Sequence, residues 1–129
     1  MCNMNIFVSY TTRDKVIDRQ LLEDASEILS AYGSFYIDLL HNDSQDKQAY
    51  VCHMLSQSDV LVLIESCSIK ESSWVLWELC EAERIGIPVL YIPAMSSKKE
   101  ILKNIRFKLN SEFKKLTKRT SKDALTRAA

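Results

Sequence analysis

Short apolar runs alternate along this chain with longer segments in which apolar residues recur at helical spacing. The apolar runs lie at residues 6–10, 35–37, 59–64 and 88–92, and each has the length of a buried strand. The run at 59–64 is apolar at every position after Asp59, as expected for a parallel strand that is covered on both faces. The pattern therefore predicts strands that alternate with helices.

Helical periodicity fills the intervals between these runs. Apolar positions between Ile17 and Leu29 recur three and four residues apart, which predicts a helix that begins at Asp14 as its N-cap. Gly33 is expected to end this helix as a C-cap residue. A second helix is expected around residues 48–55.

The second half of the chain continues the alternation. Ser72 or Ser73 is expected to cap a helix that runs to Ile85 and ends at Gly86. Beyond the fourth apolar run, the pattern predicts a helix near 98–104, a short edge strand near 106–109 and a basic helix from 111 to about 118.

Strands that alternate with helices favour right-handed crossovers and a parallel sheet between two helical layers. The predicted elements fit an α/β, flavodoxin-like three-layer sandwich, with a five-stranded parallel sheet of order 2-1-3-4-5 and helices on both faces. Ligands in such sheets bind beyond the carboxyl ends of the strands, at the switch between strands 1 and 3. This rule selects the loops at residues 10–14 and 66–73 as the candidate binding crevice.

The totals describe an ordinary globular chain. Its 129 residues fit a single domain, here placed at 1–118, with a basic C-terminal tail at 119–129. No apolar run approaches the roughly 20 residues needed to span a bilayer, and the N-terminus does not resemble a secretion signal. A cytoplasmic protein without a transmembrane segment is therefore expected. The 4 cysteines and 2 histidines show no metal-ligand spacing, so the thiols are expected to be buried or idle.

A net charge of zero conceals a strong asymmetry. Residues 1–97 contain 6 Lys+Arg and 14 Asp+Glu, a balance of −8, whereas residues 98–129 contain 11 and 3, a balance of +8. The basic segment lacks the interleaved aromatic residues of a single-strand nucleic-acid surface. Nucleic acid is therefore not an expected partner, and a solvated helix face is the favoured interpretation.

Trp74 and Glu78 are the residues with the clearest chemical potential. They lie four residues apart on a helix that begins at the predicted crevice, so they are expected to share a face. A carboxylate there stabilises a developing cation on a ribose, while an indole covers a flat heterocycle; partial burial would raise the carboxylate's pKa. Spacing alone more often yields a surface glutamate and a core tryptophan.

Further polar residues are expected at the same rim. Arg13 is suited to a phosphate or to a neighbouring acid, and Asp38, at the end of the second strand, is suited to a sugar hydroxyl or to capping a turn. Fingerprints of other enzymes on this fold, such as G-x-G-x-x-G, the P-loop and G-x-S-x-G, are absent from the sequence. The candidate substrate-binding residues are Trp74, Ser9, Tyr10, Thr11, Arg13, Asp38 and Ser66.

These segments resemble the TIR (Toll/interleukin-1 receptor) domain family, including its bacterial members. Residues 6–10 followed by Arg13-Asp14 look like the family's first box, and residues 58–66 look like its central strand. Residues 72–79 resemble its S-x-W-x-x-x-E-L segment, and residues 87–89 its fourth strand. The match runs in register from about residue 5 to residue 92.

The resemblance implies a module that cleaves NAD or makes signals from it. Glu78 aligns with the essential glutamate of catalytic members, and Trp74 with the tryptophan that lines the nucleotide site. The loop at 38–47 would gate this site and contact partners, although it lacks the usual glycine or proline. Activity in the family usually depends on assembly of several domains. No cofactor is expected, because NAD is the substrate.

Three functions remain open from the sequence. The first is a TIR-domain NAD nucleosidase that releases nicotinamide and ADP-ribose, or a cyclic or derived signalling nucleotide, with Glu78 as the catalytic residue. The alternative is a non-enzymatic TIR adaptor that acts by homotypic TIR–TIR contacts and self-association. The second alternative is a nucleoside deoxyribosyltransferase-like hydrolase, which also uses a carboxylate on a ribose carbon.

Overall fold

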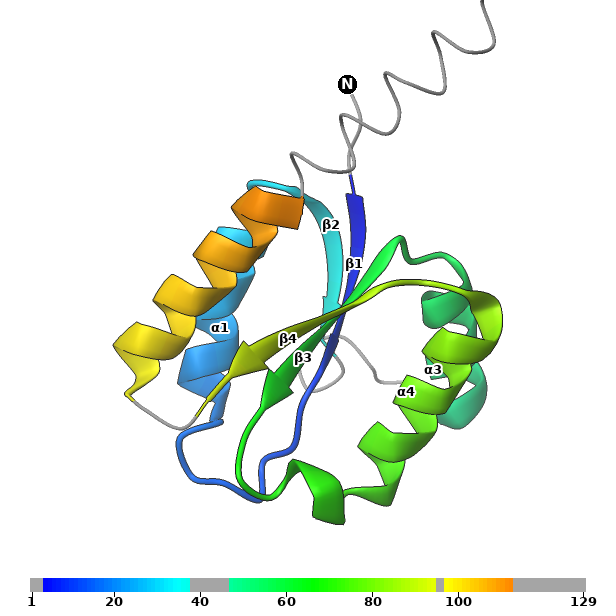
Figure 1. Cartoon of the computed structure of the whole chain (residues 1–129), viewed down its shortest axis with the longest axis horizontal. Coiled ribbons are helices and arrows are strands. Elements are labelled where there is room, and N and C mark those ends of the chain that lie inside the picture. Colours follow the sequence, from blue (N-terminus) through cyan, green and yellow to red (C-terminus); the bar gives the residue numbers. More distant parts are fainter. Residues whose placement is uncertain (1–3, 38–46, 95–96, 113–129) are drawn as a thin grey trace, which may run out of the picture.

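The structure is a computed structural model that describes residues 4–37, 47–94 and 97–112. A parallel sheet of four strands, in the order β2-β1-β3-β4, lies between two layers of helices (Figure 1). α1 and a helix over residues 98–112 cover one face, and α3 and α4 cover the other. The elements are β1 (Met4–Ser9), α1 (Arg19–Leu29), β2 (Gly33–Ile37), α3 (Lys47–Ser56), β3 (Val60–Glu65), α4 (Ser73–Ile85) and β4 (Val89–Pro93).

Alternation along β1 divides the core into two clusters. Ile6 and Val8 pack on the side of α1 and the helix at 98–112, whereas Phe7 packs on the side of α3 and α4. Successive side chains of a strand point to opposite faces, so the next residue on the α4 side is Ser9. The strand therefore ends with a polar side chain aimed at the layer that contains α4.

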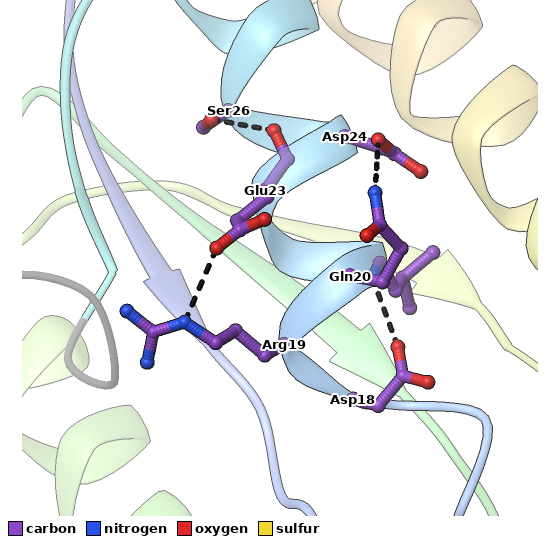
Figure 2. A network of polar contacts seen from close by, with 7 residues as sticks. Asp18, Arg19, Gln20, Glu23, Asp24 and Ser26 are labelled. Carbon is purple, nitrogen blue, oxygen red and sulfur yellow. Dashed lines mark hydrogen bonds and ion pairs between the residues drawn. The ribbon is translucent and has the colours of Figure 1, made fainter.

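The helix α1 begins four residues later than the sequence pattern predicts. Its N-cap is Asp18, whose carboxylate accepts a hydrogen bond from the Leu21 amide at 2.9 Å. Figure 2 shows this cap with the side-chain pairs along the first turns of α1. The predicted cap at Asp14 is wrong, because Asp14 is held by a different loop. The predicted C-cap at Gly33 is also wrong, since Ser30 occupies that place.

Gly33 is instead the first residue of β2, where it pairs with Met4 of β1. Its φ is +147°, and a Cβ atom added there would lie 2.1 Å from the carbonyl oxygen of Met4. Glycine is thus needed at this position for the close approach of two backbones as well as for its conformation.

The predicted strand at 106–109 is wrong, and the part of the chain that the structure describes forms a sheet of four strands, without the predicted fifth. These residues belong to the helix at 98–112, which confirms the helix predicted at 98–104 and extends it. Ile101, Ile105 and Leu109 are buried at intervals of four, so a single apolar stripe continues through the segment.

The Lys98 ammonium, at the start of this helix, donates a hydrogen bond to the Asp18 carboxylate at 2.5 Å and lowers the pKa of Asp18.

Other expectations are confirmed. The Ser72 hydroxyl accepts from the Val75 amide at 3.2 Å at the start of α4, and Gly86 ends this helix in a left-handed conformation. In contrast, Cys52, Cys67 and Cys80 are exposed rather than buried. Within the described residues, no helix is long and apolar enough to cross a membrane. The predicted gating loop up to residue 46, the end of the predicted helix at 111–118 and the tail lie outside these residues.

Candidate functional site

The carboxyl ends of β1 and β3 lie side by side at one end of the sheet, and α4 begins at the same end (Figure 1). β1 pairs with β2 on one side and with β3 on the other, so the direction in which successive strands are added to the sheet reverses between β2 and β3. A crevice at such a switch is the usual ligand site of open α/β sheets. The sequence prediction of where the switch lies is therefore confirmed.

Asp14 ties together the two loops that follow these strands. Its carboxylate accepts hydrogen bonds from the amide of Ser68 at 2.8 Å and from the Ser68 hydroxyl at 2.9 Å. The two residues are 54 positions apart in the sequence. The contact fixes the loop after β1 against the loop after β3, directly at the switch.

The surroundings of Asp14 favour its charged form. The Ser66 hydroxyl, the Ser68 amide and the Ser68 hydroxyl together hold the pKa of Asp14 below its usual value, against an opposing effect of desolvation. The Ser66 hydroxyl is buried, and no described residue meets it at full hydrogen-bond geometry.

Replacing Asp14 by asparagine is expected to loosen the two loops, because the amide is neutral and accepts at one oxygen only. Faster hydrogen exchange at the Ser68 amide would report the change. In the wild type the same loosening is expected in acid. Because the pKa of Asp14 in the folded protein lies below its ordinary value of 3.8, the charged carboxylate stabilises the fold at pH values above 3.8. This stabilisation is lost as the pH falls through the lower pKa of the folded protein. Asp24→Asn changes an α1 carboxylate that accepts from the Gln20 side chain; it is the matched control and should leave Ser68 unchanged.

Glu78 lies on the buried side of α4. The fully covered positions of this helix are Val75, Glu78 and Ala82, and Glu78 is 2% exposed. Its Oε1 accepts a hydrogen bond from the hydroxyl of Ser9 at 2.8 Å. Burial of a carboxylate is costly unless it is hydrogen-bonded, and the alternation along β1 supplies the donor from the last residue of the strand.

Trp74 lies one turn nearer the start of α4 and is 36% exposed. Its ring contacts that of Trp77, with 5.3 Å between the ring centroids and an interplanar angle of 42°. An indole is therefore present at the surface of the first turn, two residues after the Ser72 cap. Its neighbour along the same side of the helix, Glu78, is covered.

The remaining predicted site residues lie in different environments. Thr11 is buried, and its hydroxyl accepts from the amide of Arg13 at 3.3 Å, while the Arg13 side chain is exposed. Tyr10 packs against the core cluster on the α1 side. Asp38 lies outside the described residues. The structure thus brings Ser9 to Glu78, while Tyr10 faces the opposite side of the sheet.

Asp14 and Ser68 are the site residues whose contact was missed. Asp14 and Asp18 both have side chains suited to a helix cap, and the apolar stripe that begins at Ile17 favours the earlier one. Nothing in the sequence pairs Asp14 with Ser68.

A second surface feature lies on the opposite face of the sheet. A groove of about 1050 Å³ runs between α1 and the helix at 98–112. The α1 side is an acidic wall that contains Asp24 and Glu27. The other side is a basic wall in net charge, with three basic residues and the acidic Glu100, and Ile28, Ala31, Tyr32 and Leu102 lie among these side chains. Glu27, Lys99, Lys103 and Arg106 form no ion pair with another described residue. The groove thus presents unpaired charges of both signs.

Comparison with known protein families found no family model that matches the chain, and comparison with curated proteins found no similar sequence. Among the described residues, no group of three or more His, Cys, Asp or Glu side chains is arranged to hold a metal ion.

Proposed function

We propose that this chain is a TIR-type NAD nucleosidase in which Glu78 is the catalytic residue. The observation that carries the proposal is the buried Glu78 carboxylate, held by Ser9 at the carboxyl end of β1 and beside the switch of the sheet. A carboxylate in a water-poor site at the carboxyl ends of the strands is well suited to stabilise positive charge on a bound sugar. The resemblance to TIR domains supplies the substrate, NAD.

The reaction breaks the bond between the ribose C1′ and the nicotinamide nitrogen. Nicotinamide leaves as a neutral molecule with the bonding electrons, and positive charge develops on the ribose ring. The Glu78 carboxylate stabilises this charge, as carboxylates do in glycoside hydrolysis. A water molecule then adds to C1′ and loses a proton, which yields ADP-ribose; attack by a group of the same nucleotide would give a cyclic product instead.

The covered position of Glu78 has a consequence for activation. With 2% of the residue exposed, a substrate reaches the carboxylate only after the groups that cover it have moved. Assembly of several copies, on which activity depends in the family that the chain resembles, would be the event that rearranges the crevice. Turnover should therefore rise more steeply than the protein concentration.

The test is incubation of the purified protein with NAD over a range of protein concentrations, with free nicotinamide measured over hours. Nicotinamide release that increases faster than linearly with concentration is expected. A parallel incubation with deoxynucleosides distinguishes a deoxyribosyltransferase-like hydrolase, which would release free base. Absence of nicotinamide at every concentration would contradict the proposal.

The groove between α1 and the helix at 98–112 favours a second candidate, an adaptor that acts by homotypic contacts. When two copies pack face to face about an axis parallel to these helices, the acidic wall of each meets the basic wall of the other. Such a contact pairs Asp24 and Glu27 with Lys99, Lys103 and Arg106 of a second copy, and its charges make it sensitive to salt.

The charge-reversed variant Lys103→Glu is therefore expected to weaken self-association by roughly tenfold or more at low salt. The double variant Lys103→Glu, Glu27→Lys should associate again, because each wall of the groove then carries a reversed charge that faces an opposite charge on the second copy. Sedimentation velocity at low and high salt measures both effects. Lys108→Glu reverses an exposed charge that does not line the groove and is the control. An unchanged dissociation constant in Lys103→Glu would exclude this surface.

A further inference from the structure

The contact between Ser9 and Glu78 joins the carboxyl end of β1 to the buried side of α4. The Ser9 hydroxyl donates to Oε1 at 2.8 Å across 69 residues of sequence, and the two residues are 1% and 2% exposed. We propose that Ser9 is a positioning residue that orients the Glu78 carboxylate toward the ribose. The sequence suggested instead that Ser9 binds the substrate. This inference rests on the proposed function, because it assigns a role within that reaction.

The single proton of the Ser9 hydroxyl is already donated within the protein. A serine hydroxyl has one proton to donate, and in this structure that proton goes to Glu78. Ser9 therefore has none left for a ribose or phosphate oxygen while the contact is intact. Ser9 affects a substrate through the orientation of Glu78.

The hydrogen bond from Ser9 restricts the orientation of the Glu78 carboxylate. A glutamate side chain rotates about three bonds, so loss of this hydrogen bond removes a restraint on the direction in which the carboxylate points. A hydrogen bond to a charged group corresponds to roughly a 10- to 100-fold change in rate where it holds the reacting geometry.

Three variants of Ser9 separate the hydroxyl from the volume of the side chain. Ser9→Ala removes the donor, and kcat is expected to fall by roughly 10- to 100-fold with KM within about twofold. Ser9→Cys fills a similar space with a weak donor and should resemble Ser9→Ala. Ser9→Thr keeps the hydroxyl and should retain kcat within about threefold, although its extra methyl group destabilises a tightly packed site.

Ser58→Ala is the matched control. The Ser58 hydroxyl is partly buried and donates to the Met54 carbonyl at 2.7 Å, between α3 and β3 at the opposite end of the sheet. Its loss should leave kcat and KM unchanged. Each variant is compared by its thermal unfolding midpoint, so that rates refer to folded protein. If Ser9 served the fold alone, Ser9→Ala would lower the unfolding midpoint while kcat per folded molecule stayed at the wild-type value.

A spectroscopic measurement reads the contact without turnover. In protein labelled with ¹³C at the glutamate carboxyl carbons, the Glu78 signal is assigned by its loss in Glu78→Gln. This signal is expected to shift in Ser9→Ala and Ser9→Cys and to stay near its wild-type position in Ser9→Thr and Ser58→Ala. Absence of nicotinamide release by the wild type would contradict the proposed function. An active wild type, an inactive Glu78→Gln and a Ser9→Ala variant with wild-type kcat and an unshifted signal would overturn the role of Ser9 alone.

Discussion

Replacing Glu78 by glutamine is expected to slow nicotinamide release by roughly 100- to 1000-fold while the protein stays folded. Glutamine has nearly the shape of glutamate, and its amide oxygen still accepts a hydrogen bond from the Ser9 hydroxyl. The variant lacks the negative charge that, in the proposed reaction, stabilises the developing cation on the ribose. The loss should therefore appear in kcat, with a smaller effect on KM.

The interpretation depends on a folded variant and on a control from the same helix. Glu81 is three residues further along α4, where its carboxylate pairs with the guanidinium of Arg84 at 2.8 Å. Glu81→Gln removes one negative charge from the same helix without touching Ser9, and its turnover should stay close to that of the wild type. If folded Glu78→Gln releases nicotinamide at the wild-type rate, Glu78 is not the catalytic residue. Persistence of self-association in the inactive variant would show that assembly does not require turnover.

Substitution of Gly33 by alanine is expected to lower the free energy of unfolding by about 3 kcal/mol or more. Two effects combine at this position. A residue with a side chain rarely adopts a φ of +147°, and the added Cβ atom would lie 2.1 Å from the Met4 carbonyl oxygen and 2.6 Å from the Met4 amide nitrogen. Both neighbouring atoms belong to the backbone of β1, so relief requires β1 and β2 to separate at the point where their pairing begins.

Gly86 provides the control, since it shares a positive φ but not the crowding. Its φ is +83°, and no atom lies within 4 Å of an added Cβ. Gly86→Ala should therefore cost about 1–2 kcal/mol, the penalty of the left-handed conformation alone. Urea denaturation of both variants measures the difference. Equal losses in the two variants would mean that the close approach of Gly33 to Met4 contributes little to stability.

The elements that the sequence predicted correctly are those in which local signals agree. The apolar run of β3 has no polar interruption, and α4 has a serine cap at one end and a glycine at the other. Local signals were ambiguous before α1, where Asp14 and Asp18 are both acceptable caps. They were misleading at 106–109, because this segment is too short for the spacing of its apolar residues to distinguish a helix from a strand. Burial of Ile105 and Leu109 against the α1 side of the core decides that this segment is helical.

The candidate site was predictable in its location but not in its contacts. Alternating strands and helices place the switch between β1 and β3, and helical spacing places Glu78 near the beginning of α4. The hydrogen bonds of Ser9 with Glu78 and of Ser68 with Asp14 join residues 69 and 54 positions apart. Such contacts depend on the register of strands and on the rotation of a helix above the sheet. Neither follows from a local pattern.

The helix at 98–112 occupies the chain where a fifth strand was expected, and this affects how the sheet meets its surroundings. Within the described residues, β4 pairs with β3 alone. The Pro88 carbonyl and the Ala94 amide bond toward β3, so the backbone groups of Val89, Tyr91 and Pro93 point away from the sheet. Proline has no amide proton to offer an incoming strand. β4 can therefore accept a foreign strand over a short stretch only, which protects this edge against the open-ended strand addition that leads to aggregation.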